Sequence, residues 1–315
     1  MEKKTASAGA DILRYMMGQL PLLSARLGLG PEQSEELKCL LESAYHRETD
    51  SEEKPEVFMG STAESKALVG FLMNRLVSSW SIEGQDHLQS ALGHHRSGGR
   101  VVFMFNHIGN VDPPIVNHIL KAVVESGLPM VWVAGRRVWE SPFLRMFSRC
   151  VDMVTVFSEK YIRLAFGTAD FPMMRTHNIA ALRWMKKYRN LLCVFPQGTW
   201  CNTGQLTVGV PSVMAIPRIV SDDGKTDTII VPCYLEGADT IMPPLGRSEG
   251  VDEFYLFLEA VRTGRIVLKF GEPLSWNDLK DVPPEDSMYT VMCRIADLAP
   301  TEKARGPYAY SLRQA

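Results

Sequence analysis

The sequence has no run of 18 apolar residues, so no segment is long enough to cross a bilayer as a helix. Every longer apolar stretch among its 315 residues is interrupted by a charge, a glycine or a proline. The first residues, MEKKTASAGADILRYMMGQ, lack both the apolar core and the cleavage site of a secretory signal. We therefore expect a soluble or peripheral membrane protein located in the cytoplasm.

The sequence also has no CxxC pair, which makes a structural zinc site and a disulfide framework improbable. Its six cysteines are widely separated: Cys39, Cys150, Cys193, Cys201, Cys233 and Cys293. We predict that they are reduced thiols, several of them buried in strands.

An excess of one charge sign is absent as well. The chain has 34 basic and 36 acidic residues, and its formal charge is −2. Overall charge therefore gives no reason to expect nucleic acid as a partner. Hydrophobic residues make up 45% and charged residues 22% of the chain, which is typical of a folded globular protein.

Helical periodicity dominates from about Ala8 to Val77. Apolar residues recur at helical spacing in a first stretch, namely Ile12, Leu13, Met16, Met17, Leu20, Leu23 and Leu27. A second helix is predicted after Pro31, a third at Ser61–Ser79, and the charged segment RETDSEEKPE is predicted to link them. We predict a small N-terminal helical domain over residues 1–79.

Strands and helices alternate from about Trp80 onward. The predicted strands are Arg100–Asn106, Met130–Ala134, Val151–Phe157, Leu191–Phe195, Thr228–Tyr234 and Arg265–Phe270. The predicted helices are Pro113–Ser126, Met173–Tyr188 and Val251–Thr263. This order predicts an α/β domain over residues 80–315, with a mixed or mostly parallel sheet covered by helices on both faces. The segment after Pro300 is predicted to be a surface extension.

The stretch VVFMFNHIGNVDPP ends an apolar strand in His107 and places Asp112 five residues later. Ligands of open α/β sheets bind at the carboxyl ends of strands. If the loop folds back, Asp112 orients the imidazole of His107 and stabilises its protonated form, so that the ring can act as a general base. The structural alternative is that Asp112, which precedes two prolines, only caps the following helix, while His107 binds backbone.

A second strand, in LLCVFPQGTWCNTG, ends in a proline–glycine turn. By itself it is an ordinary strand-to-loop turn. If its strand is parallel to that of His107, the turn presents backbone amides and small polar side chains at the same edge of the sheet.

The two motifs together, Asn-His-x4-Asp-Pro and, about ninety residues later, Phe-Pro-x-Gly-Thr, resemble the glycerolipid acyltransferase superfamily. The block VAGRRVWESP resembles the family's second block, and VFSEKYI and DTIMPPL resemble soluble, plastid-type glycerol-3-phosphate acyltransferases. The resemblance extends from about Trp80 to Trp276. It implies transfer of a fatty acyl group from acyl-CoA or acyl carrier protein, with no metal or bound cofactor. It also implies a compartment similar to the plastid stroma as the alternative location to the cytoplasm.

The resemblance also implies roles for individual residues. His107 matches the family's base, Asp112 the acid that orients it, and Gly198 the glycine of the Phe-Pro-x-Gly-Thr block. Substrate binding is expected from four consecutive residues at this block: Gln197, Gly198, Thr199 and Trp200. Lys160 matches the lysine that holds the acceptor's phosphate. Backbone amides near Gly198 are candidates for binding the oxyanion of the tetrahedral intermediate.

Four positions depart from the family's pattern. Tyr161 replaces the histidine that neighbours the phosphate-binding lysine in the plastid-type enzymes. Gln197 stands where most members have glutamate, and Trp200 and Asn202 stand where the plastid-type enzymes have arginines. Arginine binds phosphate in a bidentate way that tryptophan and asparagine cannot reproduce. Other arginines are candidates for phosphate binding, with a solvated surface charge as the alternative for each: Arg136, Arg137 and Arg175.

The predicted reaction is acyl transfer to the hydroxyl of glycerol 3-phosphate or a related acceptor. The alternatives are a non-phosphorylated hydroxyl or amine acceptor, for which Trp200 is suited, a thioesterase, or a non-catalytic module that binds acyl chains or carrier protein. A groove for the acyl chain, or simply core, is predicted for one set of apolar residues: Trp132, Trp139, Phe143, Met146 and Phe147. The N-terminal helices are expected to pack on the α/β domain, with contact to a membrane surface as the alternative.

Overall fold

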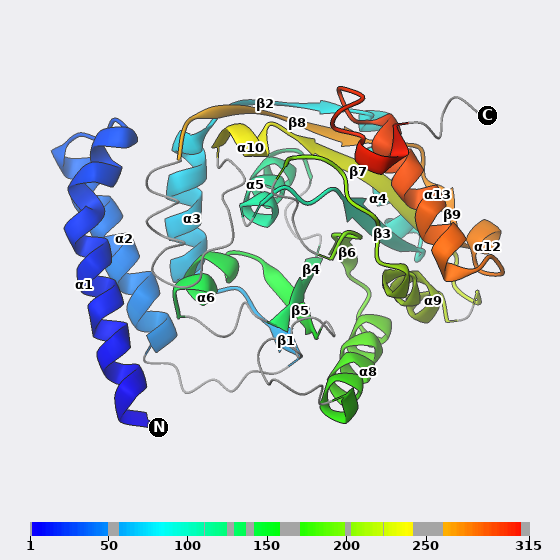
Figure 1. Ribbon diagram of the computed structural model, residues 1–315, viewed down its shortest axis with the longest axis horizontal. Helices are drawn as coiled ribbons and strands as arrows, with labels where there is room; N and C mark the ends of the chain where they lie inside the picture. Colours follow the sequence, from blue (N-terminus) through cyan, green and yellow to red (C-terminus); the bar gives the residue numbers. More distant parts are fainter. Residues whose placement is uncertain are drawn as a thin grey trace.

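A computed structural model describes residues 2–49, 57–109, 111–124, 129–136, 142–157, 171–198, 203–222, 224–241 and 261–309. Its centre is a nine-stranded sheet in the order β1-β5-β4-β6-β3-β7-β8-β2, with β9 paired to β7 (Figure 1). The strands are β1 (Phe58–Met59), β2 (Val77–Glu83), β3 (Arg100–Phe105), β4 (Met130–Gly135), β5 (Asp152–Val156), β6 (Leu191–Val194), β7 (Thr228–Glu236), β8 (Gly264–Phe270) and β9 (Leu274–Ser275).

The strand pairs are mostly parallel. β5, β4, β6, β3 and β7 run parallel to one another, and β2 is parallel to β8, whereas β1, β8 and β9 are antiparallel to the strands that they extend. The carboxyl ends of the five central strands therefore lie at one edge of the sheet. The predicted α/β class with a mostly parallel sheet is confirmed.

Helices cover both faces of the sheet. Val101, Phe103 and Phe105 of β3 belong to one buried apolar cluster, and the alternate residues Val102 and Met104 belong to another. The first cluster includes residues of α3 (Ala63–Leu76), α4 (Gln85–Arg96), α5 (Asp112–Val123), α6 (Pro142–Ser148) and α10 (Ala238–Ile241). The second includes residues of α8 (Phe171–Lys187), α9 (Ala215–Val220), α12 (Trp276–Leu279) and α13 (Pro284–Asp297). A strand buried on both faces explains why β3 is continuously apolar from Val101 to Phe105 rather than alternating.

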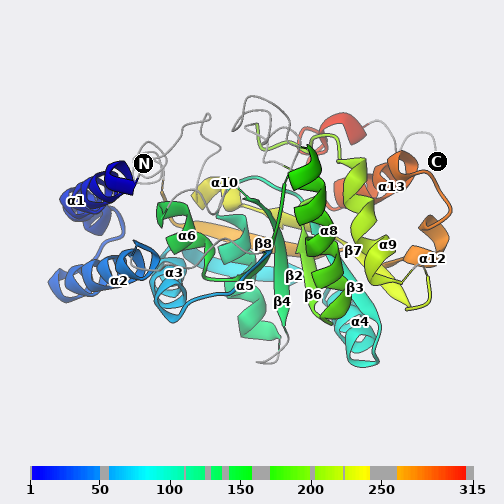
Figure 2. The same cartoon turned by 90° about the horizontal axis from the view of Figure 1, so that it is seen from below.

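The N-terminal helices lie at one end of the molecule, opposite α12 and α13 (Figures 1 and 2). Helix α1 (Glu2–Arg26) packs on α2 (Pro31–Thr49), and α2 packs on α3. Their buried residues, among them Met16 and Leu41, belong to the same apolar cluster as Phe103 in the sheet. The division into a domain over residues 1–79 and a domain over residues 80–315 stays a prediction.

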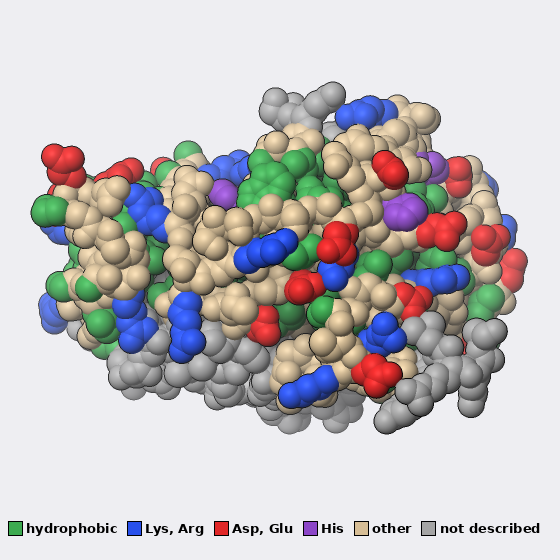
Figure 3. All heavy atoms as spheres, turned by 90° about the horizontal axis from the view of Figure 1, so that it is seen from above, with side chains coloured by type: hydrophobic (Ala, Val, Ile, Leu, Met, Phe, Trp, Pro, Cys, Tyr) green, Lys and Arg blue, Asp and Glu red, His purple; other side chains and the backbone are tan. Residues whose placement is uncertain are grey.

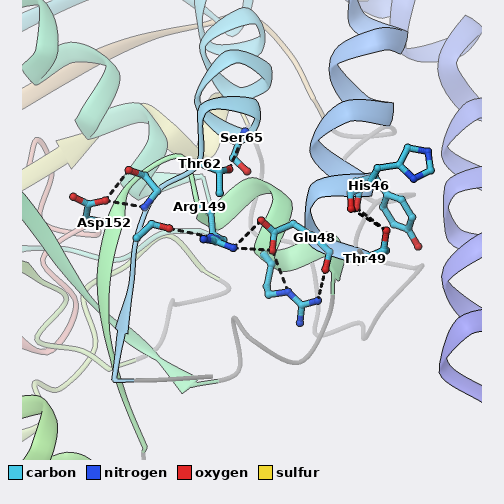
Figure 4. Close-up of polar contacts among 11 residues, drawn as sticks. His46, Glu48, Thr49, Thr62, Ser65, Arg149 and Asp152 are labelled. Atoms are coloured by element: carbon cyan, nitrogen blue, oxygen red, sulfur yellow. Dashed lines mark hydrogen bonds and ion pairs between the residues drawn. The ribbon is translucent and has the colours of Figure 1, made fainter. Parts of the chain in front are cut away.

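A buried ionic cluster connects α2 to α6 and to Arg149, which directly follows α6 (Figure 4). The carboxylate of Glu48, which is 1% exposed, lies 3.3 Å from Nη1 of Arg149 and 3.2 Å from Nε of Arg145. Arg149 also donates to the carbonyl of Gly60, 2.9 Å away, and Arg145 donates to the carbonyl of Glu48. A buried carboxylate needs such partners because its charge has lost its hydration.

Several predictions of element boundaries and exposure need correction. The third helix ends at Leu76 rather than Ser79, because residues 77–83 pair with β8 as strand β2. Helices α4 and α13 have no counterpart among the helices that the sequence predicts. The helix predicted at Val251–Thr263 lies outside the described residues except for residues 261–263, which are not helical. The segment after Pro300 is not merely a surface extension, because Tyr308 is 3% exposed and packs in the second apolar cluster.

No helix of the described residues is long and apolar enough to span a membrane. Within the same residues, no three His, Cys, Asp or Glu side chains are arranged to hold a metal ion. The described cysteines are free thiols, and burial raises the pKa of Cys150 to about 12 and raises those of Cys193 and Cys233 as well. On the face seen in Figure 3, basic and acidic side chains are interspersed rather than gathered by sign.

Candidate active site

The candidate site begins where β3 and β6, which are paired neighbours, reach the carboxyl edge of the sheet. All six residues of β3 are buried. Asn106, the next residue, extends the pairing of β3 with β7 through its side chain. The side-chain oxygen accepts from the amide of Leu235 at 2.5 Å, and the side-chain nitrogen donates to the carbonyl of Leu235 at 3.0 Å. The backbone entering the His107 loop is therefore held on the side of β7 before the loop begins.

His107 and Asp112 are in direct contact. Nδ1 of His107 lies 2.8 Å from Oδ2 of Asp112, whose side chain is fully buried, while that of His107 is 15% exposed. A carboxylate oxygen accepts, so Nδ1 carries the proton and Nε2 is the acceptor nitrogen of the neutral ring. The contact also stabilises an imidazolium if Nε2 takes up a proton.

The same carboxylate shapes the loop between the two residues. Oδ2 of Asp112 accepts from the backbone amides of Ile108, at 2.6 Å, and Gly109, at 2.9 Å. The alternative that Asp112 only caps the helix is wrong, because Asp112 is the first residue of α5, Val111 holds the cap position, and the cap has no side-chain hydrogen bond. The carboxylate turns back toward the loop that it closes. Proline is tolerated in the first turn that follows, since the amides there lack intrahelical partners.

The imidazole of His107 lies on an aromatic stack. Its ring is 3.9 Å from that of Phe195, centroid to centroid, with an interplanar angle of 11°, and Phe195 is in turn 5.1 Å from Trp132. Trp132 is 1% exposed and Met146 is fully buried, so these two residues of the predicted acyl groove are core. The stack fixes the plane of the histidine ring from the side of β6 and β4.

Gln197 bridges the His107 loop and the segment after β6. Its Oε1 accepts from the backbone amide of His107 at 2.8 Å, and its Nε2 donates to Oγ1 of Thr207 at 2.9 Å. The side chain is 3% exposed. Both ends of this amide are thus engaged within the protein.

Gly198 occupies a turn that requires its conformation. Its φ is +67°, in the left-handed region, and an added Cβ would lie 3.1 Å from Cγ2 of Val210. Its amide donates to the carbonyl of Phe195 at 3.0 Å, so this amide is used by the turn itself. Thr199 and Trp200, which follow it, lie outside the described residues.

Arg136 and Arg175 belong to the neighbouring part of the same edge. The guanidinium of Arg136 is 5.9 Å from the ring centroid of Phe157. His177 of α8 contacts the same ring and lies 2.8 Å from the carbonyl of Thr155. Burial lowers the pKa of His177, the bond to Thr155 opposes this, and the charge of Arg136 lowers it further. Arg175 is exposed on α8.

The structure brings together His107, Asp112, Gln197 and Gly198 at the ends of β3 and β6. Arg137, Lys160 and Trp139 lie outside the described residues, and nothing is described of the side chain of Phe143.

Asn106, Phe195 and Thr207 are parts of the site that the sequence does not predict. Asn106 could have been suspected from its place beside His107, and Phe195 from its place in the Phe-Pro-x-Gly-Thr block. No local signal marks Thr207.

Comparison with known families identifies one domain. Residues 80–236 match a family model described as Acyltransferase, and this segment contains the second half of β2 and all of β3 to β7, with His107, Asp112 and Gln197. The match supports the resemblance to the glycerolipid acyltransferase superfamily and an acyltransferase activity in general. No curated protein matches the chain.

Proposed function

We propose, from the acyltransferase domain at residues 80–236, that the chain transfers a fatty acyl group from acyl-CoA or acyl carrier protein to the hydroxyl of glycerol 3-phosphate or a related acceptor. The observation that carries this proposal is the 2.8 Å contact between Nδ1 of His107 and the buried carboxylate of Asp112. It leaves Nε2 as the nitrogen that would receive a proton. No metal or bound cofactor takes part in the proposed reaction.

In the proposed mechanism Nε2 of His107 removes the proton of the acceptor hydroxyl while its oxygen attacks the thioester carbonyl carbon. The tetrahedral intermediate collapses by breaking the carbon–sulfur bond. The imidazolium then returns its proton to the departing thiolate. Asp112 keeps the ring in one tautomer and compensates the positive charge of the imidazolium, as carboxylates beside histidine bases generally do.

The preference for a phosphorylated acceptor depends on basic residues. Arg136, half-buried at the end of β4, supports such a preference, and Arg175, Arg137 and Lys160 are proposed to contribute. The substrate-binding roles of Thr199 and Trp200 likewise remain proposals from the resemblance. A neutral hydroxyl or amine acceptor is the alternative that Trp200 favours.

The test is incubation with labelled acyl-CoA or acyl carrier protein, with and without glycerol 3-phosphate. We expect acceptor-dependent product from the wild type and a loss of at least about a hundredfold in His107→Ala. His46→Ala, an exposed histidine on α2, is the control and should keep full activity.

Lys160→Ala should raise KM for glycerol 3-phosphate without a matching loss for a neutral acceptor. Acid released without any acceptor would indicate a thioesterase instead. If the wild type binds the acyl donor but neither transfers nor hydrolyses its acyl group, the enzymatic proposal is contradicted.

A further inference from the structure

We infer that Gln197 is a positioning residue that holds the backbone of His107 and does not contact a substrate. The inference rests on the function proposed above. Gln197 follows β6 and His107 follows β3, so residues 90 positions apart meet because these two strands are paired. With an exposed fraction of only 3%, the side chain of Gln197 presents little surface to any bound molecule.

The orientation of the Gln197 amide is determined by its partners. The backbone nitrogen of His107 can only donate, so the atom facing it at 2.8 Å must be the carbonyl oxygen. The amide nitrogen therefore faces Thr207, whose hydroxyl oxygen accepts at 2.9 Å. A buried amide with both ends bonded in this way has one preferred orientation, because a flip would set two donors against each other.

The residues on either side of Thr207 are held by the C-terminal segment. The amide of Leu206 donates to the carbonyl of Ala304 at 2.9 Å, and that of Gly209 donates to the hydroxyl of Tyr308 at 3.2 Å. An added Cβ at Gly209 would lie 2.6 Å from the sulfur of Met288, so this segment packs closely on α13. Gln197 thus connects His107 to a part of the molecule that is fixed independently of the His107 loop.

Each part of His107 then has its own support. Asp112 holds Nδ1, Phe195 holds the plane of the ring, and Gln197 holds the backbone amide. A base displaced by about 1 Å from its working position can lose about a hundredfold in rate. Gln197 also holds this amide without adding a second negative charge beside the imidazole.

Three variants test the inference. Gln197→Leu removes both bonds, Thr207→Val removes the bond that orients the amide, and Gln197→Glu keeps an oxygen for the His107 amide. We expect Gln197→Leu to lower kcat about tenfold to a hundredfold with KM for donor and acceptor changed less than threefold. Thr207→Val should lower kcat less. Gln89→Leu, on the exposed face of α4, is the control and should change nothing.

Gln197→Glu distinguishes a positioning role of residue 197 from a general contribution to the stability of the fold. It should recover most of kcat, and it should move the acidic limb of the pH–rate profile upward by about one pH unit, since a nearby carboxylate favours the protonated imidazole. Gln89→Glu adds the same charge on α4 and should leave the profile in place. A tenfold rise in KM at unchanged kcat in Gln197→Leu would instead indicate contact with a substrate and overturn the inference.

Hydrogen exchange of the His107 amide provides a readout that needs no activity. In 15N-labelled protein without substrate, we expect exchange at this amide to be at least about tenfold faster in Gln197→Leu than in the wild type. Unchanged exchange in a folded variant overturns the inference. If Gln197→Leu does not fold, exchange in Thr207→Val decides instead. An inactive wild type with the expected exchange pattern would refute the proposed function and leave the role of Gln197 intact.

Discussion

At the scale of single residues, the carboxylate of Asp112 has two tasks. Its Oδ2 accepts from the imidazole of His107 and from two backbone amides of the loop, while Oδ1, also buried, has no hydrogen-bond partner among the described residues. The three donors offset the loss of hydration that a buried carboxylate incurs. Orientation of the imidazole and closure of the loop therefore depend on the same oxygen.

Asp112→Asn should therefore affect both activity and stability. We expect kcat to fall by about a hundredfold or more, because a neutral amide stabilises the imidazolium less and can impose the wrong tautomer. The free energy of unfolding should fall by about 1–3 kcal/mol through weaker bonds to the loop amides. Acyl-transfer kinetics and urea unfolding measure the two effects.

The control for this variant is Asp86→Asn, an exposed acidic residue in the first turn of α4. It should lose no activity and at most a few tenths of a kcal/mol. Equal effects of the two substitutions would mean that Asp112 acts only as a first-turn charge.

At the scale of elements, the segment after α13 supports the site from outside the acyltransferase domain. Residues 206–209 lie between the turn that contains Gly198 and the short helix η3 (Gly306–Tyr308). Gly306 has a φ of +56°, and an added Cβ there would lie within clash distance of the carbonyl of Leu206. The close approach of these two backbones therefore requires a glycine.

Tyr308→Phe tests this support. The substitution keeps the ring but removes the oxygen that accepts from the buried amide of Gly209. We expect a loss of about 1–3 kcal/mol in the free energy of unfolding and a measurable fall in kcat, since Thr207 lies in the same segment. Tyr289→Phe is the matched control, because its ring is 5.7 Å from that of Tyr308 and it is 52% exposed. An unchanged Tyr308→Phe protein would show that apolar packing and the bond between Leu206 and Ala304 hold the segment without the tyrosine hydroxyl.

At the scale of the whole molecule, the N-terminal helices and the sheet are joined by apolar packing and by the cluster around Glu48. One apolar cluster runs from α1 to β3, and Arg149, which is 4% exposed, pairs with Glu48 across 101 positions of the sequence. A buried arginine that loses its partner has no water to replace it.

Glu48→Gln should therefore destabilise the whole fold. We expect a loss of about 3–5 kcal/mol in the free energy of unfolding, because two guanidiniums remain with one neutral amide between them. The midpoint of urea unfolding, followed by circular dichroism, measures it. Glu35→Gln removes the exposed ion pair with Lys38 on the same helix and should cost less than about 1 kcal/mol. A similar small cost at Glu48 would mean that water reaches the cluster.

Local patterns in the sequence by themselves determined the order of most strands and helices, the apolar character of β3, and the placing of His107 at a strand end. Periodicity and turn residues carry that information within a few positions. Edge strand β2 escaped prediction because it directly continues a helical pattern and only three of its seven residues have substantial burial. The sequence also leaves two roles open for Asp112, capping the helix and closing the His107 loop. Both roles need an acidic residue at nearly the same position, so local sequence does not distinguish them.

Only the tertiary structure decided how these local pieces meet. The pairing of β3 with β6 brings Gln197 to the amide of His107, and the packing of the C-terminal segment brings Tyr308 to Gly209. Contacts between residues 90 or more positions apart depend on strand order and on the burial of complementary surfaces. The physical reason is that such hydrogen bonds form only when the complete core has packed. The packing of the core depends on the whole sequence and not on any local stretch.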